Sequence, residues 1–150
     1  MTFDGIVREL RQEEQDAALA LAWRVFLEFE APDYTKQGVD AFDRSIHETA
    51  YLAQLRWYGA FEKETLVGVL ATRSEGTHIA LFFVDGQHHR QGIGRRLFAL
   101  AESHNPSGKM TVHSSRYAVP VYHRLGFRDT GDEQSVSGLL FTPMERQRGD

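Results

Sequence analysis

Hydrophobic residues recur with helical spacing in the first third of the chain. After Glu13 the apolar positions fall three or four residues apart, on one face of an expected helix: Ala18, Leu21, Ala22, Val25 and Phe29. Pro32 ends this segment, because proline cannot continue a helix that precedes it. A second stripe follows and predicts one further helix, with its apolar positions at Val39, Phe42, Ile46, Ala50 and Ala53.

The hydrophobic period then changes to that of strands. Residues 57–62 and 66–72 flank the polar pair Lys63-Glu64 and predict a hairpin. Residues 77–84 are apolar enough to form a buried central strand. Two more helices are expected at 93–101 and 117–125, the second ended by Gly126. The remaining expected strands are 6–10, 110–113, 127–130 and 139–142.

The order β-α-α-β-β-β-α-β-α-β-β is typical of the α/β (α+β) class. It predicts a single mixed sheet, mostly antiparallel, with helices on both faces. The length of 150 residues is that of one ordinary domain, so residues 1–150 are expected to form a single domain.

Composition narrows the class of protein. The absence of cysteine excludes a disulfide framework, a zinc ribbon and a thiol nucleophile. The net charge of −4 argues against a general nucleic-acid binder. No apolar run approaches the ~20 residues of a membrane helix, and no basic region followed by an apolar core opens the chain. We therefore expect a cytoplasmic protein without membrane or nucleic-acid partners.

The segment that carries chemistry runs from the expected central strand into the helix near residue 93. Gly92-Ile93-Gly94 opens that helix after a polar loop. Unpaired amides at a helix start attract an anion, and glycines remove the Cβ atoms that would hold a phosphate away. Arg90, Arg95 and Arg96 add positive charge, so the segment predicts a phosphate or diphosphate seat. Alone, the Gly-x-Gly pattern is equally typical of a packing turn.

Two motifs together resemble the GCN5-related N-acetyltransferases (GNAT). Val84, followed eight residues later by Gly92-Ile93-Gly94, resembles motif A, Arg/Gln-x-x-Gly-x-Gly/Ala, with His89 at its first position. Residues 115–127 resemble motif B, Asn-x-x-Ala-x-x-x-Tyr-x-x-x-Gly-Phe. Ser115 stands where asparagine is usual, and the matching positions are Tyr122, Gly126 and Phe127. The two motifs occur in the order of that family.

This resemblance implies an acetyl-CoA site and no metal. In that family the sheet splays beside the central strand, whose backbone bonds the pantetheine arm while the helix-start amides hold the pyrophosphate. Carried over by position, the cofactor would be bound by Phe82, Val84, His89, Arg90, Gln91, Gly92, Ile93, Gly94, Arg95 and Ser115. A metal is also not expected from the histidines, because His47-Glu48 lacks the second histidine of a zincin motif at Tyr51.

The implied reaction moves an acetyl group from acetyl-CoA to a primary amine by direct attack. Tyr122 matches the family's general acid. A base is also required, since a lysine-like amine with a pKa of ~10.4 is mostly protonated at neutrality. His78 is a candidate, although a histidine capping a strand explains it equally well. Glu28, Glu30 and Asp33 are further candidates, and Glu28 and Glu30 would attract a cationic amine unless they form a solvated face.

Other classes of function stay open at this point. The departures at His89 and Ser115 are compatible with a non-catalytic CoA-binding or regulatory module. Nucleic-acid binding through Arg90, Arg95 and Arg96 is disfavoured by the net charge. A homodimer could form through exposed edge strands at the carboxyl end.

Overall fold

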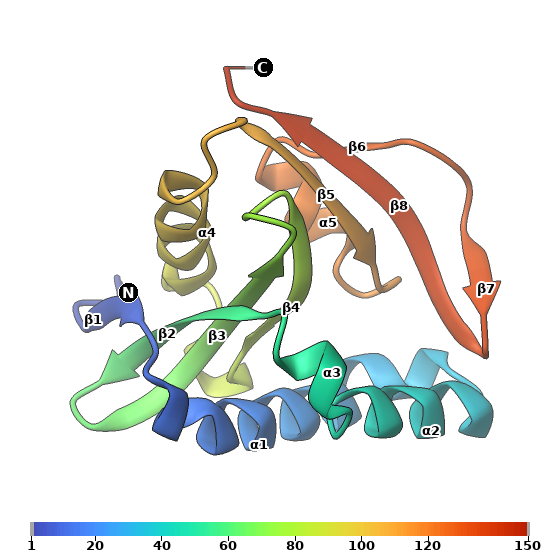
Figure 1. Cartoon of the computed structure of the whole chain (residues 1–150), viewed down its shortest axis with the longest axis horizontal. Helices are drawn as coiled ribbons and strands as arrows, with labels where there is room; N and C mark the ends of the chain where they lie inside the picture. The colour runs from blue at the N-terminus through green and yellow to red at the C-terminus, as the bar shows by residue number, and fades with distance from the viewer. Residues whose placement is uncertain (1, 150) are drawn as a thin grey trace.

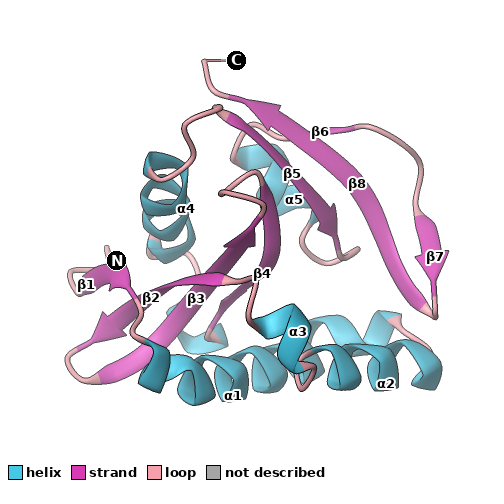
Figure 2. Ribbon diagram, viewed as in Figure 1, coloured by secondary structure: helices cyan, strands magenta, loops and turns pink. Residues whose placement is uncertain are grey.

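The computed structural model describes residues 2–149 and arranges eight strands in the order β1-β2-β3-β4-β5-β8-β6, with β7 paired to β8 (Figures 1 and 2). The strands are β1 (Ile6–Glu9), β2 (Arg56–Glu62), β3 (Thr65–Arg73), β4 (His78–Val84), β5 (Lys109–Ser114), β6 (Arg128–Asp129), β7 (Gln134–Val136) and β8 (Leu139–Gln147). The helices are α1 (Gln15–Val25), α2 (Lys36–Ser45), α3 (Thr49–Leu52), α4 (Ile93–Ser103) and α5 (Val119–Arg124). Short non-α turns are η1 (Gln12–Glu14), η2 (Phe26–Glu30), η3 (Ala31–Asp33) and η4 (Gly86–His88).

The sheet opens between its two central strands. β4 and β5 are the parallel pair, and their register holds at only two positions, His78 with Thr111 and Ile79 with Val112. Beyond Ile79, β4 continues to Val84 with β3 as its partner. The other strand pairs are antiparallel. The prediction of a mixed, mostly antiparallel sheet flanked by helices and splayed at the centre is confirmed.

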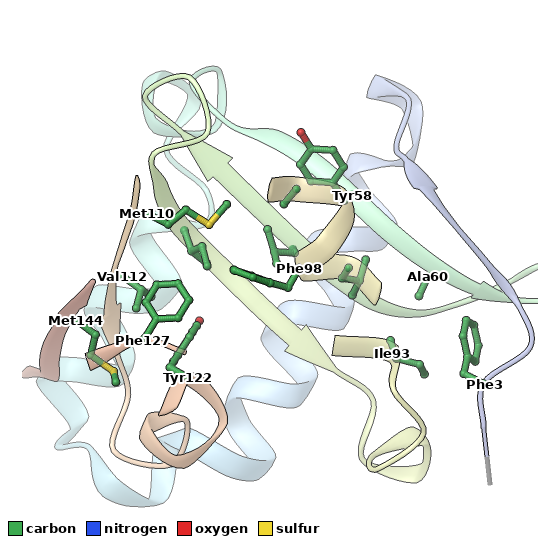
Figure 3. Packing of buried hydrophobic residues seen from close by; sticks show 14 of the residues in the cluster. Phe3, Tyr58, Ala60, Ile93, Phe98, Met110, Val112, Tyr122, Phe127 and Met144 are labelled. Carbon is green, nitrogen blue, oxygen red and sulfur yellow. The ribbon is translucent and has the colours of Figure 1, made fainter. Parts of the chain in front are cut away.

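Two hydrophobic cores cover the two faces of the sheet. The first packs against α4 and α5 and includes Tyr58, Ile93, Phe98, Met110, Tyr122 and Phe127 (Figure 3). The second packs against α1 and α2, which lie along the lower edge of the molecule in Figure 1, and includes Leu21, Val25, Phe26, Phe42, Val69 and Phe83. Both faces of the central strands are therefore buried, as their continuous apolar sequence predicts.

A bulge in β4 decides which side chains face which core. Ala71 pairs with Leu81 whereas Thr72 pairs with Ile79, so Ala80 is an extra residue without its own partner. Strand residues normally alternate between faces, and a bulge interrupts that alternation. As a result Ile79 packs in the first core together with Phe82, while Leu81 packs in the second.

Most predicted elements are confirmed. The hairpin forms around Lys63, whose φ is 57°, and Gly126 ends α5 with φ 96°, in the left-handed region that favours glycine. The apolar stripe of the first helix is buried as predicted at Ala18, Leu21, Ala22 and Val25. No helix within residues 2–149 is long and apolar enough to cross a membrane.

The single helix predicted from Val39 to Ala53 is wrong. It is broken into α2 and α3, and Ala50 and Ala53 are exposed. Side chains take the carbonyls near the break: Ser45 Oγ donates to Phe42 O at 2.8 Å, and His47 Nδ1 donates to Asp43 O at 2.7 Å. Such bonds compete with the backbone ladder, which explains why the helix stops there.

The carboxyl-terminal strands also differ from the prediction. β8 extends to Gln147 rather than ending at Thr142, because Pro143 still accepts a bond from the Thr130 N–H at 2.8 Å. The strand β7 was not predicted, since its residues are exposed and lack apolar alternation.

The β7–β8 hairpin is seated on the start of α2. A Cβ built on Gly38 would lie 2.2 Å from the carbonyl oxygen of Gly138, so the two glycines meet backbone to backbone. Tyr34 Oη donates to Leu140 O at 3.1 Å and ties the same hairpin to η3–α2. These contacts fix the position of β8 above α2.

Replacing Gly38 with alanine tests this contact. Alanine is the better helix former by about 1 kcal/mol, but its methyl group would force the hairpin away from α2. We expect Gly38→Ala to lower the free energy of unfolding by about 1–3 kcal/mol, as overpacking does elsewhere. Urea denaturation measures the change. Gln37→Ala, on the preceding exposed position, is the control and should not destabilise. A Gly38→Ala protein as stable as the wild type would contradict the contact.

Candidate active site

The backbone around Gly92 forms an open anion seat. Arg90 and Gly92 have φ of 64° and 87°, and Gly92 caps the amino terminus of α4. The first bond of that helix runs from Arg96 N to Gly92 O at 3.1 Å. Within the described part of the chain, the N–H groups of residues 90–95 have no acceptor. A Cβ on Gly92 would meet nothing within 4 Å, so the space beside this helix start is open, and unpaired amides at a helix start favour an anion.

This seat opens into a cleft of about 760 Å³, which we call the anion cleft. Its walls come from the ends of β4 and α4 and from α5 and η2. Its basic lining residues are Arg90, Arg95 and Arg124, none of which has an ion-pair partner among residues 2–149. Phe29 lies across the cleft, with its ring 5.2 Å from that of Tyr117 and 4.9 Å from that of His89. The cleft combines unpaired amides with unpaired cations, which suits a polyanionic ligand.

A second cavity of about 520 Å³ continues on the other side of the gap between β4 and β5. We call it the aromatic chamber, because eight phenylalanine and tyrosine rings line it: Phe26, Tyr34, Phe42, Tyr51, Phe82, Phe83, Tyr122 and Phe141. Leu139 and Leu140 of the seated hairpin line it as well. The residues shared by the two cavities are Glu30, Phe82, Phe83, Ala118 and Tyr122. The two cavities therefore meet at one acid and one phenol.

Tyr122 is held at this junction by packing. It projects from α5 beside Phe127 (Figure 3). Its ring lies 5.3 Å from that of Phe127 and 6.0 Å from that of Phe82, both edge to face. Its side chain is buried, with 5% of its surface exposed. Burial raises the pKa of the Tyr122 phenol, and the nearby charge of Glu30 raises it further. The hydroxyl is therefore protonated at neutral pH and available as a donor.

Glu30 stands at the end of η2 and exchanges its proton near neutrality. Burial raises the pKa of its carboxyl group to about 7, since desolvation disfavours the charged form. A hydrogen bond with Ser115 lowers this pKa, and the charge of Asp33 raises it. A carboxyl group tuned to this range, in a cleft and beside a phenol, has the properties of a general base.

Several of the predicted site residues line the anion cleft together. They are Phe82, Val84, His89, Arg90, Gly92, Ile93, Gly94, Arg95 and Tyr122, with Glu30 from the acceptor candidates. Gln91 does not line it; the Gln91 carbonyl accepts a bond from the Phe3 N–H at 2.9 Å. Arg96 is likewise turned away and donates to Gly5 O at 2.9 Å.

The two positions that depart from the family motifs have structural partners. His89 Nε2 donates to the Val84 carbonyl at 2.8 Å and so ties the loop to the end of β4. Ser115 lines the chamber rather than the anion cleft, and its Oγ accepts a bond from the Ala118 N–H at 3.2 Å. Ser115 thus supports the turn that precedes α5.

His78 and Glu28 lie outside both cavities. His78 Nδ1 is hydrogen-bonded to Thr111 Oγ1 at 2.8 Å, and its ring packs 5.1 Å from that of His113. Burial, with the charges of Arg73 and His113, lowers the pKa of His78 to about 4, so it is neutral. Glu28 is exposed and lies beside Gly86. Of the acidic acceptor candidates, the structure brings Glu30 to the junction.

Sequence reasoning missed most of the chamber. Tyr34, Arg44, Tyr51 and His113 line it from four separate elements and share no motif. The rings of Tyr34, Tyr51 and His113 are equally typical of an ordinary core, and a single arginine carries no signal of its own. Only the packing of α2, α3 and β8 around the open edge of β4 brings them together.

Comparisons with known proteins agree with this geometry. The family model of the acetyltransferase (GNAT) domain matches residues 30–148. Among curated proteins, none matches the sequence. A similar solved structure is that of a GCN5-related N-acetyltransferase (aminotransferase, class II) from Rhodopseudomonas palustris, at 18% identity, 98% of each chain covered and a TM-score of 0.83.

Two further similar structures contain coenzyme A. The PaiA N-acetyltransferase from Thermoplasma acidophilum has 16% identity and a TM-score of 0.75, with 97% of this chain and 99% of that chain covered. An aminoglycoside 6'-N-acetyltransferase has 12% identity and a TM-score of 0.63, with the same coverage. These identities show a shared fold. The family match, which spans most of the chain, shows that this protein belongs to the GNAT acetyltransferase family.

Proposed function

We propose that this protein is an acetyl-CoA-dependent N-acetyltransferase that acetylates a primary amine by direct attack. The observation that carries the proposal is the junction of the anion cleft with the aromatic chamber at Glu30 and Tyr122. A general base and a general acid there stand between a seat for phosphates and a chamber for a second substrate.

The residues of the anion cleft fit coenzyme A. The amides of residues 92–95 would hold its diphosphate, with Arg90 and Arg95 supplying positive charge. The part of β4 that β5 leaves unpaired, from Phe82 to Val84, would align the pantetheine arm as an added strand. Bound acetyl-CoA supplies an acetyl thioester at the junction.

Each proton of the reaction has an assigned residue. Glu30 removes a proton from the substrate ammonium, which frees the nitrogen lone pair for attack on the acetyl carbonyl. The C–N bond forms and the C–S bond breaks, and Tyr122 hydrogen-bonds and protonates the departing thiolate. The second proton lost by the nitrogen restores the phenol, and Glu30 releases the first to solvent, so the products are an acetamide, coenzyme A thiol and one proton.

The alternative of a non-catalytic CoA-binding module is less well supported. Its motivation was the departures at His89 and Ser115, and both side chains have structural partners in this fold. A pure binding module would also have no use for a buried acid with a pKa of about 7 beside a phenol.

The direct test is release of thiol from acetyl-CoA in the presence of a panel of primary amines. Because the chain contains no cysteine, a thiol reagent reports coenzyme A without a protein background. Amine-dependent release supports an acetyltransferase. Tight binding of coenzyme A without release from any amine would favour the binding module.

Arg95→Gln is predicted to weaken coenzyme A binding about tenfold, since it removes one charge-assisted contact to a phosphate. Calorimetry measures the dissociation constant, and the difference should shrink at high salt as the charge is screened. Lys63→Gln removes the same charge from the exposed β2–β3 turn and serves as the control. Equal weakening by both variants would mean that long-range charge, not the seat, holds the cofactor.

Tyr122→Phe is predicted to lower kcat about 10²-fold or more, the range of a lost general acid. Its affinity for coenzyme A should remain within about twofold of the wild type, because phenylalanine preserves the packing against Phe82 and Phe127. Steady-state kinetics and calorimetry separate the two effects. Parallel loss of turnover and affinity would assign Tyr122 to cofactor binding instead.

Glu30 predicts a pH dependence with a definite sign. The ionised carboxylate is the active base, so kcat/KM should rise with pH and level off above its pKa of about 7. Glu30→Gln should abolish this rising limb and lower activity at pH 8. A rising limb that persists unchanged in the variant would refute Glu30 as the base.

The stability of the same variant provides the control. A carboxyl group whose folded pKa lies above its unfolded value of ~4.3 makes the wild type lose stability as pH rises between those values. Glu30→Gln removes this loss, so at pH 8 the variant should be at least as stable as the wild type in urea. Low activity there cannot then be explained by unfolding.

A further inference from the structure

The arginines in the described part of this chain fall into two groups: those whose side chains have a hydrogen-bond or ion-pair partner, and those whose side chains have none. Most are held by carboxylates or carbonyls, as Arg8 is by Glu14 and Arg24 by Asp85. Among residues 2–149, the arginine side chains with no hydrogen bond and no ion pair are Arg44, Arg73, Arg90, Arg95 and Arg124. Three of them line the anion cleft, where the proposed function requires cations for phosphates. The other two, Arg44 and Arg73, belong to the opposite end of the site.

Arg44 lines the outer end of the aromatic chamber. It lies in the last turn of α2, and its neighbours in the lining are Ser45 and Tyr51 at the α2–α3 junction. Arg44, Ser45 and Tyr51 line the chamber and not the anion cleft, and the Arg44 side chain is exposed to solvent at this end. A basic residue at a helix carboxyl terminus stabilises the helix dipole, but that role does not require it to line a cavity.

Arg73 adds a second positive charge close to two residues that line the chamber. Its Nε is buried and has no hydrogen-bond acceptor. Its charge lowers the pKa of His113 and opposes the rise of the Tyr51 pKa that burial causes, so it lies near both of these lining residues. Arg73 does not itself line the chamber, so it adds positive charge near this end and no direct contact to a ligand.

The chamber is therefore polarised along its length. Among its described lining residues, the ones with formal charge at neutral pH are Glu30 at the junction and Arg44 at the outer end. His113 is kept neutral by burial and by Arg73. Between the two charges the walls are rings and aliphatic groups, with the seated β7–β8 hairpin above them. A second ammonium group on the substrate would be repelled at the Arg44 end.

We propose that the acceptor is a small amino acid-like molecule, with its primary amine at Glu30, an apolar or aromatic body in the chamber and a carboxylate held by Arg44. The placement of the amine at Glu30 rests on the proposed function. The placement of the carboxylate at Arg44 rests only on the lining of the chamber. The cavity of about 520 Å³ is within the ~300–1,000 Å³ of small-molecule sites. The charge of Arg44 disfavours a second ammonium group, such as that of a polyamine, at this end of the chamber.

The test uses two pairs of amines that differ only in the carboxylate. They are 6-aminohexanoate against hexylamine, and 4-(aminomethyl)benzoate against 4-methylbenzylamine. With acetyl-CoA and the full chain, kcat/KM should be at least about tenfold higher for one or both carboxylates than for their neutral partners. Arg44→Gln should reduce that preference about tenfold, and Lys63→Gln, with the same change in net charge, should not alter it. A structural defect would lower both members of a pair and leave their ratio intact.

A binding measurement separates this inference from the proposed function. Calorimetry with 4-methylbenzoate, which has no amine, on the coenzyme A-loaded protein should show binding that Arg44→Gln weakens about tenfold. If no amine is acetylated but this binding holds, the proposed function fails and the carboxylate site stands. Neutral amines preferred or equal in both pairs, or 4-methylbenzoate binding unchanged in Arg44→Gln, would overturn the carboxylate site.

Discussion

The site depends on the parting of β4 from β5. Their pairing stops after Ile79, which leaves the far half of β4 with one strand neighbour inside the molecule rather than at its rim. An internal edge of this kind exposes backbone groups that need partners. His89 satisfies one of them from within the chain by donating to the Val84 carbonyl. The rest of the gap is the space in which the anion cleft and the aromatic chamber meet.

The bulge at Ala80 determines which β4 side chains border this gap. Neighbouring residues of a strand face opposite sides, and the bulge sets which side each takes: Phe82 faces the α4 side with Ile79, while Phe83 faces the α1–α2 side. Both border the junction. Tyr122 reaches the same point from α5 and Glu30 reaches it from η2. η2 is a π-helical turn that extends α1, a form often found at functional sites. Irregular backbone thus brings Glu30 to the junction, whereas Tyr122 comes from the regular helix α5.

Sequence reasoning succeeded where the signal is local. The glycines at 92, 94 and 126 mark a helix start and a helix end. These backbone constraints can be predicted from the sequence without knowing which residues pack nearby. The break between α2 and α3 was missed because it depends on Ser45 and His47 bonding backward to carbonyls. His78 and Glu30 were both candidates for the base, and only their tertiary positions distinguish them. His78 hydrogen-bonds Thr111 outside the cavities, whereas Glu30 lies where the two cavities join.

The placement of Glu30 also shows why the charge balance of the whole chain says little about its ligands. The net charge is −4, yet the unpaired arginines gather around the two cavities while other arginines are neutralised by acids. In that setting a carboxylate at the junction is desolvated and its pKa rises to about 7, which disfavours its charged form in the folded state. Stability alone would favour glutamine at this position. A partly buried acid whose pKa is shifted toward neutrality, in a cleft and beside a phenol, supports the proposed exchange of its proton with a substrate.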